Sequence, residues 1–182
     1  MGQVPSEFVS LIETVDDAKN INVKNSEKLA YATQTTLSLD DTREILTVLK
    51  KRFPSIKGPN SEDICYATTN RQQAVKSMAN LCDTILVIGA ENSSNSLRLV
   101  EVALSHGVKK AQLIPDEYRL DQFLEGFNPS ITPNLGLTAG ASAPETLVQV
   151  LISKLKKDFD VNLIDHAVTK ENITFNLPKI LR

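Results

Sequence analysis

The stretch from Thr84 to Ser96 reads TILVIGAENSSNS and decides the fold. Residues 84–88 form a short run of aliphatic and β-branched side chains, which predicts a strand buried on both faces. Small hydroxyl and amide side chains follow at once, at residues 92–96. In an open parallel sheet, ligands bind outside the carboxyl ends of the strands, where the next helix begins with unpaired N–H groups and a partial positive charge. The stretch therefore predicts an α/β protein with an anion site at this strand end.

Composition limits the classes of protein to which the chain can belong. It has 182 residues, of which 41% are hydrophobic and 23% are charged, as is typical of a globular protein with a sizeable core. A net charge of -2 and a pI near 5.7 argue against a nucleic-acid-binding surface. No apolar run approaches the roughly 20 residues that span a bilayer, and residues 1–15 lack the pattern of a signal peptide. We therefore expect a cytoplasmic protein with neither nucleic acid nor membrane as a partner.

Cysteine and histidine are scarce. Cys65 and Cys82 are too few for a disulfide framework and too far apart for a CxxC pair. Cys82 falls on the apolar face of a predicted helix with Val75, so we interpret it as a core residue. His106 and His166 have no partner at metal-ligand spacing, which favours structural roles for both.

The amino-terminal third predicts part of a further α/β unit. Residues 28–33 predict a short strand, and Ser38 predicts the N-cap of a helix whose residues 45, 49 and 53 share an apolar face. Residues 54–60 are rich in Pro, Gly and Asn and predict a linker. After this linker, residues 68–70 predict the N-cap region of the next helix.

The remaining chain continues the alternation of helices and strands. A helix is predicted from about Asn95, with residues 97, 100 and 104 on one face and Gly107 at its end. Strands are predicted at residues 111–114 and 135–139, with an acidic crossing segment at residues 116–133 between them. Ser142 and Glu145 predict a capping box at the start of a helix with an apolar stripe at residues 147, 151 and 155.

The predicted fold is thus α/β, with tandem open parallel-sheet units and an extended tail. Residues 1–61 form a partial unit and residues 62–149 form a complete one. Residues 150–182 form a carboxyl-terminal tail that packs back on the domain. In this tail, the alternation from residue 159 onward predicts extended chain that forms edge strands.

Polar residues at three predicted strand ends, together with Cys65 in a fourth polar junction, define the predicted site. The three ends are Gln34-Thr35-Thr36, Asn92 to Ser96 and Gly140 to Pro144. Loops of Ser and Asn are most often turns and caps, and a lone cysteine is most often an inert small side chain. Their joint appearance at successive strand ends favours a common binding site instead.

Five segments of the chain, in order and with matching spacing, resemble 4-hydroxy-3-methylbut-2-enyl diphosphate reductase. They are YATQTTLSLDDT (31–42), DICYATTNRQ (63–72), NSSNS (92–96), TAGASAP (138–144) and ENITFNLP (171–178). This family contains the terminal iron–sulfur enzymes of the methylerythritol phosphate route to isoprenoids. The resemblance implies a trefoil of α/β units around a central [4Fe-4S] cluster, which three cysteine thiolates hold with one iron left open.

The resemblance also implies roles for individual residues. Cys65 matches one of the three cluster ligands. Thr35 matches the threonine near the reacting hydroxyl end of the substrate. Ser93, Ser94, Asn95 and Ser142 match the positions that bind the diphosphate. In the implied reaction the open iron acts as a Lewis acid on the hydroxymethyl oxygen, while two electrons and a proton expel water and leave isopentenyl and dimethylallyl diphosphates. Reduced ferredoxin or flavodoxin is the implied electron donor.

The chain matches only the carboxyl-terminal part of such a reductase. The other two cluster cysteines, the proton-donating glutamate and the diphosphate-binding histidines have no counterpart here, so no catalytic residue is expected in this chain. Because one thiolate cannot hold a cubane cluster, we expect the chain alone to be inactive and the missing amino-terminal portion to act in cis or in trans. Two alternatives stay open: a stand-alone diphosphate-binding module and a non-catalytic subunit of a split enzyme.

Overall fold

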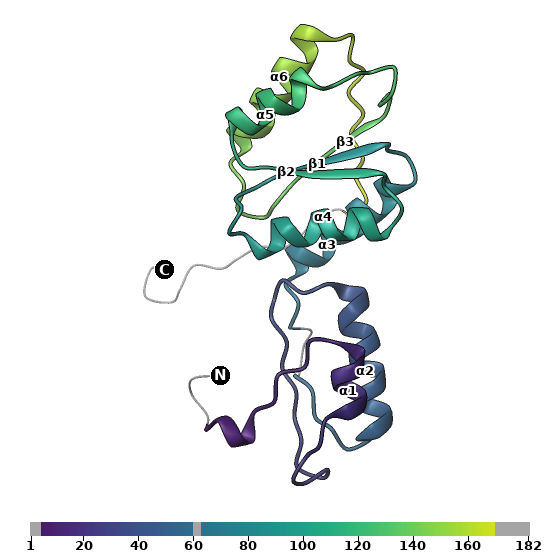
Figure 1. The fold of residues 1–182 in the computed structure, drawn as a ribbon, viewed down its shortest axis with the longest axis vertical. Coiled ribbons are helices and arrows are strands. Elements are labelled where there is room, and N and C mark those ends of the chain that lie inside the picture. The colour runs from purple at the N-terminus through teal and green to yellow at the C-terminus, as the bar shows by residue number, and fades with distance from the viewer. Residues whose placement is uncertain (1–4, 60–62, 170–182) are drawn as a thin grey trace, which may run out of the picture.

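The computed structural model describes residues 5–59 and 63–169, which Figure 1 shows as two parts joined end to end. We call residues 5–59 the amino-terminal part and residues 63–169 the carboxyl-terminal part. The elements of the amino-terminal part are η1 (Ser6–Phe8), α1 (Val15–Asn20) and α2 (Leu39–Arg52). Those of the carboxyl-terminal part are α3 (Tyr66–Ala79), β1 (Thr84–Ile88), α4 (Ser94–Ser105), β2 (Lys110–Ile114), α5 (Glu117–Glu125), β3 (Leu135–Ala139) and α6 (Glu145–Asp158).

The three strands form one parallel sheet in the order β2-β1-β3. The central strand β1 is buried along its whole length, as its continuous apolar run predicts. Its side chains alternate between two layers of helices, because successive residues of a strand point to opposite faces. Ile85 and Val87 pack with α3 and α4, whereas Leu86 and Ile88 pack with α5 and α6 (Figure 1). The predicted α/β class with an open parallel sheet is confirmed.

Local sequence sets the ends of several helices as predicted. The Ser38 side chain accepts a hydrogen bond from the Asp41 N–H at the start of α2. Gly107 follows α4 with a φ of 94°, a backbone conformation that glycine adopts without steric cost. In α6, Leu151 and Leu155 are buried and Leu147 packs beside them, which confirms the predicted apolar stripe.

Three predictions about helices in the carboxyl-terminal part are wrong. The N-cap of helix α3 lies three residues before the predicted region 68–70: it is Cys65, and Thr68 is buried within the helix. The predicted crossing segment at 116–133 contains helix α5, which the Asp116 side chain caps through the Arg119 N–H. The capping box between Ser142 and Glu145 does not form, because α6 has Pro144 at its N-cap position and no side-chain cap.

The apolar face predicted for α4 is not the face that the structure buries. Leu97 and Leu104 are 44% and 48% exposed, so these two side chains lie on the outside of the helix. The buried face instead carries Leu99, Val102 and Ala103 together with polar residues of the first turn. The orientation of α4 therefore follows from its amino end, which packs against the strand ends described below.

The amino-terminal part has a small core of its own around Ala18, Leu49 and Phe53. A capping box between Thr14 and Asp17 starts α1. The strand predicted at residues 28–33 is reduced to a single parallel bridge between Ala30 and Lys57. Within the described residues, this segment pairs with no full strand that would extend the bridge into a sheet.

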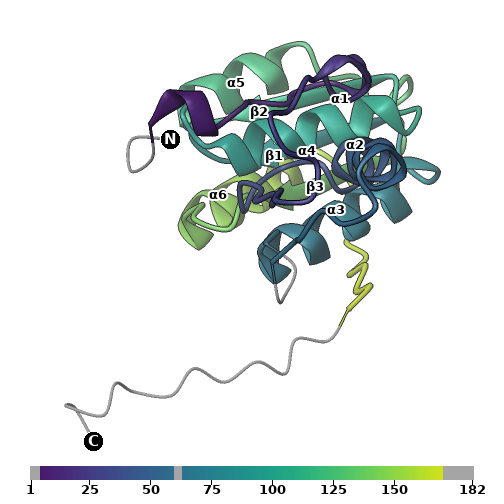
Figure 2. The ribbon, with the colours of Figure 1, turned by 90° about the horizontal axis from the view of Figure 1, so that it is seen from below.

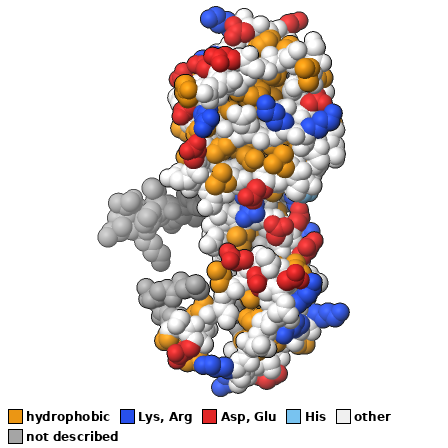
Figure 3. All heavy atoms as spheres, in the orientation of Figure 1, with side chains coloured by type: hydrophobic (Ala, Val, Ile, Leu, Met, Phe, Trp, Pro, Cys, Tyr) orange, Lys and Arg blue, Asp and Glu red, His pale blue; other side chains and the backbone are white. Residues whose placement is uncertain are grey.

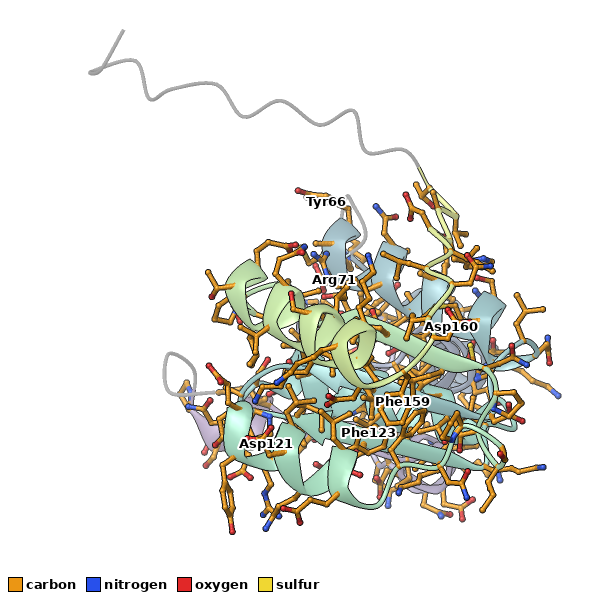
Figure 4. All side chains as sticks on the ribbon, turned by 90° about the horizontal axis from the view of Figure 1, so that it is seen from above. Tyr66, Arg71, Asp121, Phe123, Phe159 and Asp160 are labelled. Carbon is orange, nitrogen blue, oxygen red and sulfur yellow. The ribbon has the colours of Figure 1, made fainter. Side chains whose placement is uncertain are left out.

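The chain after α6 is extended. Residues 160–169 contain no helix or strand, and this segment passes α3, where His166 Nε2 lies 2.8 Å from Ser77 Oγ (Figure 2). At its beginning, Phe159 joins Phe123 and Phe127 in the core between α5 and α6 (Figure 4). The edge strand predicted from residue 159 onward does not form in residues 160–169, so this part of the prediction is wrong, and the part at residues 171–178 lies outside the described residues. Helix α6 runs through the predicted domain boundary at residue 149.

Candidate functional site

The amino end of α4 lies on the carboxyl ends of β1 and β3. The Ser93 side chain caps the helix: its Oγ accepts a hydrogen bond from the Ser96 N–H at 3.3 Å and another from Ser96 Oγ at 3.0 Å. These bonds hold Ser96 in one rotamer, with only 1% of its surface exposed. The first N–H groups of a helix have no partner within it, so this end of α4 offers donors to an anion.

Two glycines allow this close approach. A Cβ at Gly89, directly after β1, would overlap Ser96 Oγ, and so would a Cβ at Gly140, directly after β3. Gly140 is itself held to β1, because its N–H donates to the Ile88 carbonyl at 2.8 Å. The two strand ends and the helix end thus form one rigid corner, which we call the anion corner: Ser93 to Ser96 with Gly89 and Gly140 to Ser142.

Asn95 is the unusual residue of the anion corner. It is 7% exposed, and among the described residues both polar atoms of its side-chain amide are buried without a hydrogen-bond partner. Its Nδ2 would lie 3.7 Å from a Cβ at Gly140. A buried amide that makes no hydrogen bond costs about 1–3 kcal/mol, so a corner that retains one has an unused capacity to bind a polar group.

The other predicted diphosphate positions surround Asn95. Ser94 is exposed on the first turn of α4, and Ser142 is exposed in the turn after β3. The Ala143 N–H donates to the Gly140 carbonyl and closes this turn at 3.0 Å. The corner therefore gathers Ser93, Ser94, Asn95 and the turn that carries Ser142.

Thr35 and Cys65 form a second pair. The Cys65 N–H donates to the Thr35 carbonyl at 3.0 Å, although the two residues belong to different parts of the chain. Both side chains are exposed, and Cys65 is the N-cap of α3. Nearby, the Asp63 carboxylate accepts from the Thr33 N–H at 2.7 Å. The predicted threonine and thiol are therefore brought side by side.

Arg71 links this pair to the anion corner. Its Nε donates to the Ala139 carbonyl at 3.1 Å, at the last residue of β3, and its Nη1 donates to the Ala67 carbonyl at 3.2 Å. Figure 4 shows Tyr66 pointing away from the molecule at the start of α3 and Arg71 pointing inward. Arg71 follows Cys65 by six residues, which is about 9 Å along a helix. One side chain thus ties the helix that carries Cys65 to the strand that leads to Ser142.

Arg71 and Gln72 lie in the segment DICYATTNRQ (63–72), but the sequence motifs predicted no role for either residue. Gln72 is fully buried and binds the backbone of the amino-terminal part, as described below. The spacing of residues 68, 72, 75 and 79, which share the buried face of α3, could have indicated the role of Gln72. A glutamine on a buried helix face requires hydrogen-bond partners.

The histidines have structural partners. His106 Nδ1 lies 2.9 Å from the Val102 carbonyl, and its Nε2 lies 3.6 Å from the Asp40 carboxylate. Within residues 5–59 and 63–169, no three His, Cys, Asp or Glu side chains are grouped as a metal would require. Cys65 alone therefore does not form a complete cluster site within the described residues. In the same residues no helix is both long and apolar enough to cross a membrane.

These features define a class: an α/β protein in which a helix begins on the carboxyl ends of parallel strands, a place where proteins of this architecture commonly bind anions. Comparison with known proteins identifies the group within this class. The family model described as "LytB protein" matches residues 1–156. The chain belongs to the LytB family.

Two relatives illustrate the similarity. The 4-hydroxy-3-methylbut-2-enyl diphosphate reductase of Roseobacter denitrificans is 49% identical over 185 residues, and that of Hyphomonas neptunium is 51% identical over 181 residues. Each match covers 100% of this chain and 56% of the relative, so the chain spans little more than half the length of these proteins.

A solved structure agrees in fold. The E-1-hydroxy-2-methyl-but-2-enyl-4-diphosphate reductase from Plasmodium falciparum superposes with a TM-score of 0.75 at 32% identity, over 93% of this chain and 52% of the other. The resemblance to the reductase family that the sequence motifs carried is thereby confirmed.

Proposed function

We propose that this chain is the diphosphate-holding portion of a 4-hydroxy-3-methylbut-2-enyl diphosphate reductase. In this proposal Ser93, Ser94, Asn95 and Ser142 bind the diphosphate of the substrate. Thr35 lies near its hydroxyl end, and Cys65 supplies one of the three thiolates of a [4Fe-4S] cluster. The electron donor is a protein of the ferredoxin or flavodoxin type, and the enzyme works in the cytoplasm.

The observation that carries the proposal is the unpartnered amide of Asn95. A diphosphate at the amino end of α4 would accept from Nδ2 and from the first N–H groups of the helix, which also contributes about half a positive charge. The hydroxyls of Ser94 and Ser142 are exposed beside it. These donors suit an anion of several oxygens, because each oxygen accepts more than one hydrogen bond.

The share of this chain in the chemistry is to bind and orient. The close packing of Gly89 and Gly140 against Ser96 fixes the anion corner before a ligand arrives, which lowers the entropic cost of binding. When bound, an iron–sulfur cluster would supply electrons and a Lewis-acidic iron. The chain contains two cysteines, of which Cys82 is half-buried beside Gly136, so the remaining cluster ligands belong to polypeptide beyond these 182 residues, in cis or in trans.

The test is calorimetric titration of the chain with isopentenyl diphosphate. The variant Asn95→Leu keeps the volume of the side chain and removes both polar atoms. We expect its affinity to fall by about tenfold or more, since a lost hydrogen bond to a charged group is worth at least 1.4 kcal/mol. Its stability to urea should be unchanged or higher, because the cost of burying an unpartnered amide disappears.

Asn80→Leu is the matched control, since Asn80 is exposed at the end of α3. It precedes the start of β1, whereas the corner lies beyond the opposite end of that strand. It should bind isopentenyl diphosphate as the unmodified chain does. Absence of binding to the unmodified chain, equal affinity in Asn95→Leu, or equal loss in Asn80→Leu would each contradict the proposal. Binding without any partner present would also show that the corner works as a module by itself.

A further inference from the structure

The junction between the two parts of the chain is polar. The core of the amino-terminal part contains residues between positions 12 and 56, and the two cores that flank the sheet contain residues between positions 75 and 161. No core cluster in the described chain includes residues of both parts. Apolar packing is not directional, whereas hydrogen bonds are, so the orientation of one part against the other depends on a few polar contacts.

Gln72 makes two of these contacts. Its Oε1 accepts from the Leu39 N–H at 3.1 Å, and its Nε2 donates to the Leu37 carbonyl at 2.9 Å. The two partners flank Ser38, the N-cap of α2, so one side chain from α3 holds the point where the chain turns into α2. Gln72 has an exposed fraction of 0%. Loss of either bond would leave a part-buried backbone group at the start of α2 without this partner, and an unpaired buried group costs about 1–3 kcal/mol.

Ion pairs between α2 and the helices α3 and α4 lie around the contact that Gln72 makes, at more exposed positions. Lys76 Nζ lies 2.6 Å from the Asp40 carboxylate, with His106 Nε2 at 3.6 Å from the same group. Arg98 lies 3.7 Å from Asp41. Figure 3 shows acidic and basic side chains gathered at this level of the molecule. Asp40 and Asp41 are 40% and 69% exposed, and such ion pairs contribute little to rigidity compared with a buried hydrogen bond.

We propose that Gln72 is a positioning residue that fixes the orientation of the amino-terminal part on the carboxyl-terminal part. Thr35 belongs to the first part, and the anion corner belongs to the second. The two bonds of Gln72 therefore set where Thr35 lies relative to a diphosphate in the corner. This consequence rests on the proposed function, whereas the orientation itself does not.

The test measures the distance between the two parts by pulsed electron paramagnetic resonance of the full chain. Spin labels are placed on Thr47→Cys in α2 and Gln149→Cys in α6, both exposed, in a background of Cys65→Ser and Cys82→Ala. Gln72→Met keeps the length of the side chain and removes both bonds, so the distance distribution should broaden or shift. Gln73→Met, the same change at the exposed neighbouring position, should leave the distribution narrow.

Gln72→Glu provides a second variant that keeps the shape and the acceptor. Its carboxyl group can donate to the Leu37 carbonyl only when protonated, and burial favours the protonated form. The distribution should be narrow at about pH 5 and broad at about pH 9. Asp40, Arg43, Lys76 and His106 face the same junction, so the unmodified chain is measured at both pH values and should stay narrow.

The outcomes are separable from those of the proposed function. Gln72→Met should bind isopentenyl diphosphate as the unmodified chain does, because the anion corner lies within the carboxyl-terminal part. A narrow distribution in Gln72→Met, equal broadening in Gln73→Met, or a Gln72→Glu distribution no narrower at acidic pH would overturn the inference. None of these results depends on whether the anion corner binds a diphosphate.

Discussion

The close approach of Gly140 to Ser96 leads to a prediction about paired substitutions. In Gly140→Ala the new Cβ would overlap Ser96 Oγ, but it would lie 3.4 Å from Ser96 Cβ, an ordinary van der Waals distance. Removing the hydroxyl should therefore remove the clash. At Gly89 the situation differs, because a Cβ there would lie 2.7 Å from Ser96 Cβ, and that contact persists when the hydroxyl is gone.

The magnitudes follow from this geometry. Overpacking at a buried position costs about 1–3 kcal/mol, so Gly140→Ala alone should be destabilising by that amount. Ser96→Ala alone loses its bond to Ser93 and should cost about 0.5–1.5 kcal/mol. In the Ser96→Ala background, Gly140→Ala should become neutral or stabilise by up to about 1 kcal/mol, because alanine restricts the unfolded chain. The coupling free energy between positions 96 and 140 is then about 1–3 kcal/mol.

The assay is urea unfolding of the full chain followed by far-ultraviolet circular dichroism, for the three single variants and the two double variants. Gly89→Ala should remain destabilising by about 1–3 kcal/mol with or without the Ser96 hydroxyl. The reasoning is refuted if Ser96→Ala rescues both glycine variants equally or rescues neither. The first result would mean that the helix end shifts freely over the strand ends, and the second that the Ser96 hydroxyl is not what excludes a Cβ.

Two further predictions concern titration and reactivity. The hydrogen bond from Lys76 lowers the pKa of Asp40, so Lys76→Met should raise this pKa toward its ordinary value in a carboxyl-carbon NMR titration, while the lowered pKa of Asp17 should not move. The stability that ionised Asp40 contributes at neutral pH, which is lost as the pH falls through its lowered pKa, should shrink accordingly. Burial raises the pKa of the Cys82 thiol, and the neighbouring Asp83 carboxylate adds a smaller effect in the same direction. Iodoacetamide at neutral pH should therefore modify the exposed Cys65 at least about tenfold faster than Cys82, and peptide mass mapping measures the two rates. Faster modification of Cys82 would contradict this.

Much of the carboxyl-terminal part could be predicted because its signals are local. The run at 84–88 is apolar after Thr84, which indicates a buried strand, and Gly107 marks a helix end through its own backbone conformation. Helix α5 was missed because a short helix with Pro115 before it and acidic residues along it resembles a crossing loop in composition. Its Asp116 cap was the available signal.

The orientation of α4 could not be predicted from periodicity. Leu97 and Leu104 have the spacing of an apolar face, and so do Leu99 and Val102, so the pattern alone does not distinguish the two. Packing of Ser96 between Gly89 and Gly140 decides in favour of the second face. This contact joins residues that are far apart in sequence, which explains why no local signal revealed it.

For the candidate site too, the sequence indicated the residues but not the contacts that depend on the fold. Sequence motifs indicated Thr35, Cys65, Ser93, Ser94, Asn95 and Ser142, and their roles stay predictions. They did not indicate that both polar atoms of Asn95 are buried without partners, nor that Arg71 and Gln72 hold α3 to the rest of the molecule. Such bonds depend on which backbone groups meet in space, and residue type shows only that a partner must exist.

Two different kinds of contact therefore position the two halves of the candidate site. The anion corner is fixed by the Ser96 side chain packed on the backbone of Gly89 and Gly140, where no Cβ fits, so changes there should act on the affinity for an anion. Thr35 is placed by hydrogen bonds across the junction, directly from the Cys65 N–H and through Gln72, so changes there should act on the geometry between the corner and the reacting end. A full-length relative in which a variant at the position of Gln72 bound substrate normally yet turned it over slowly would show this division directly, because affinity and alignment would then fail separately.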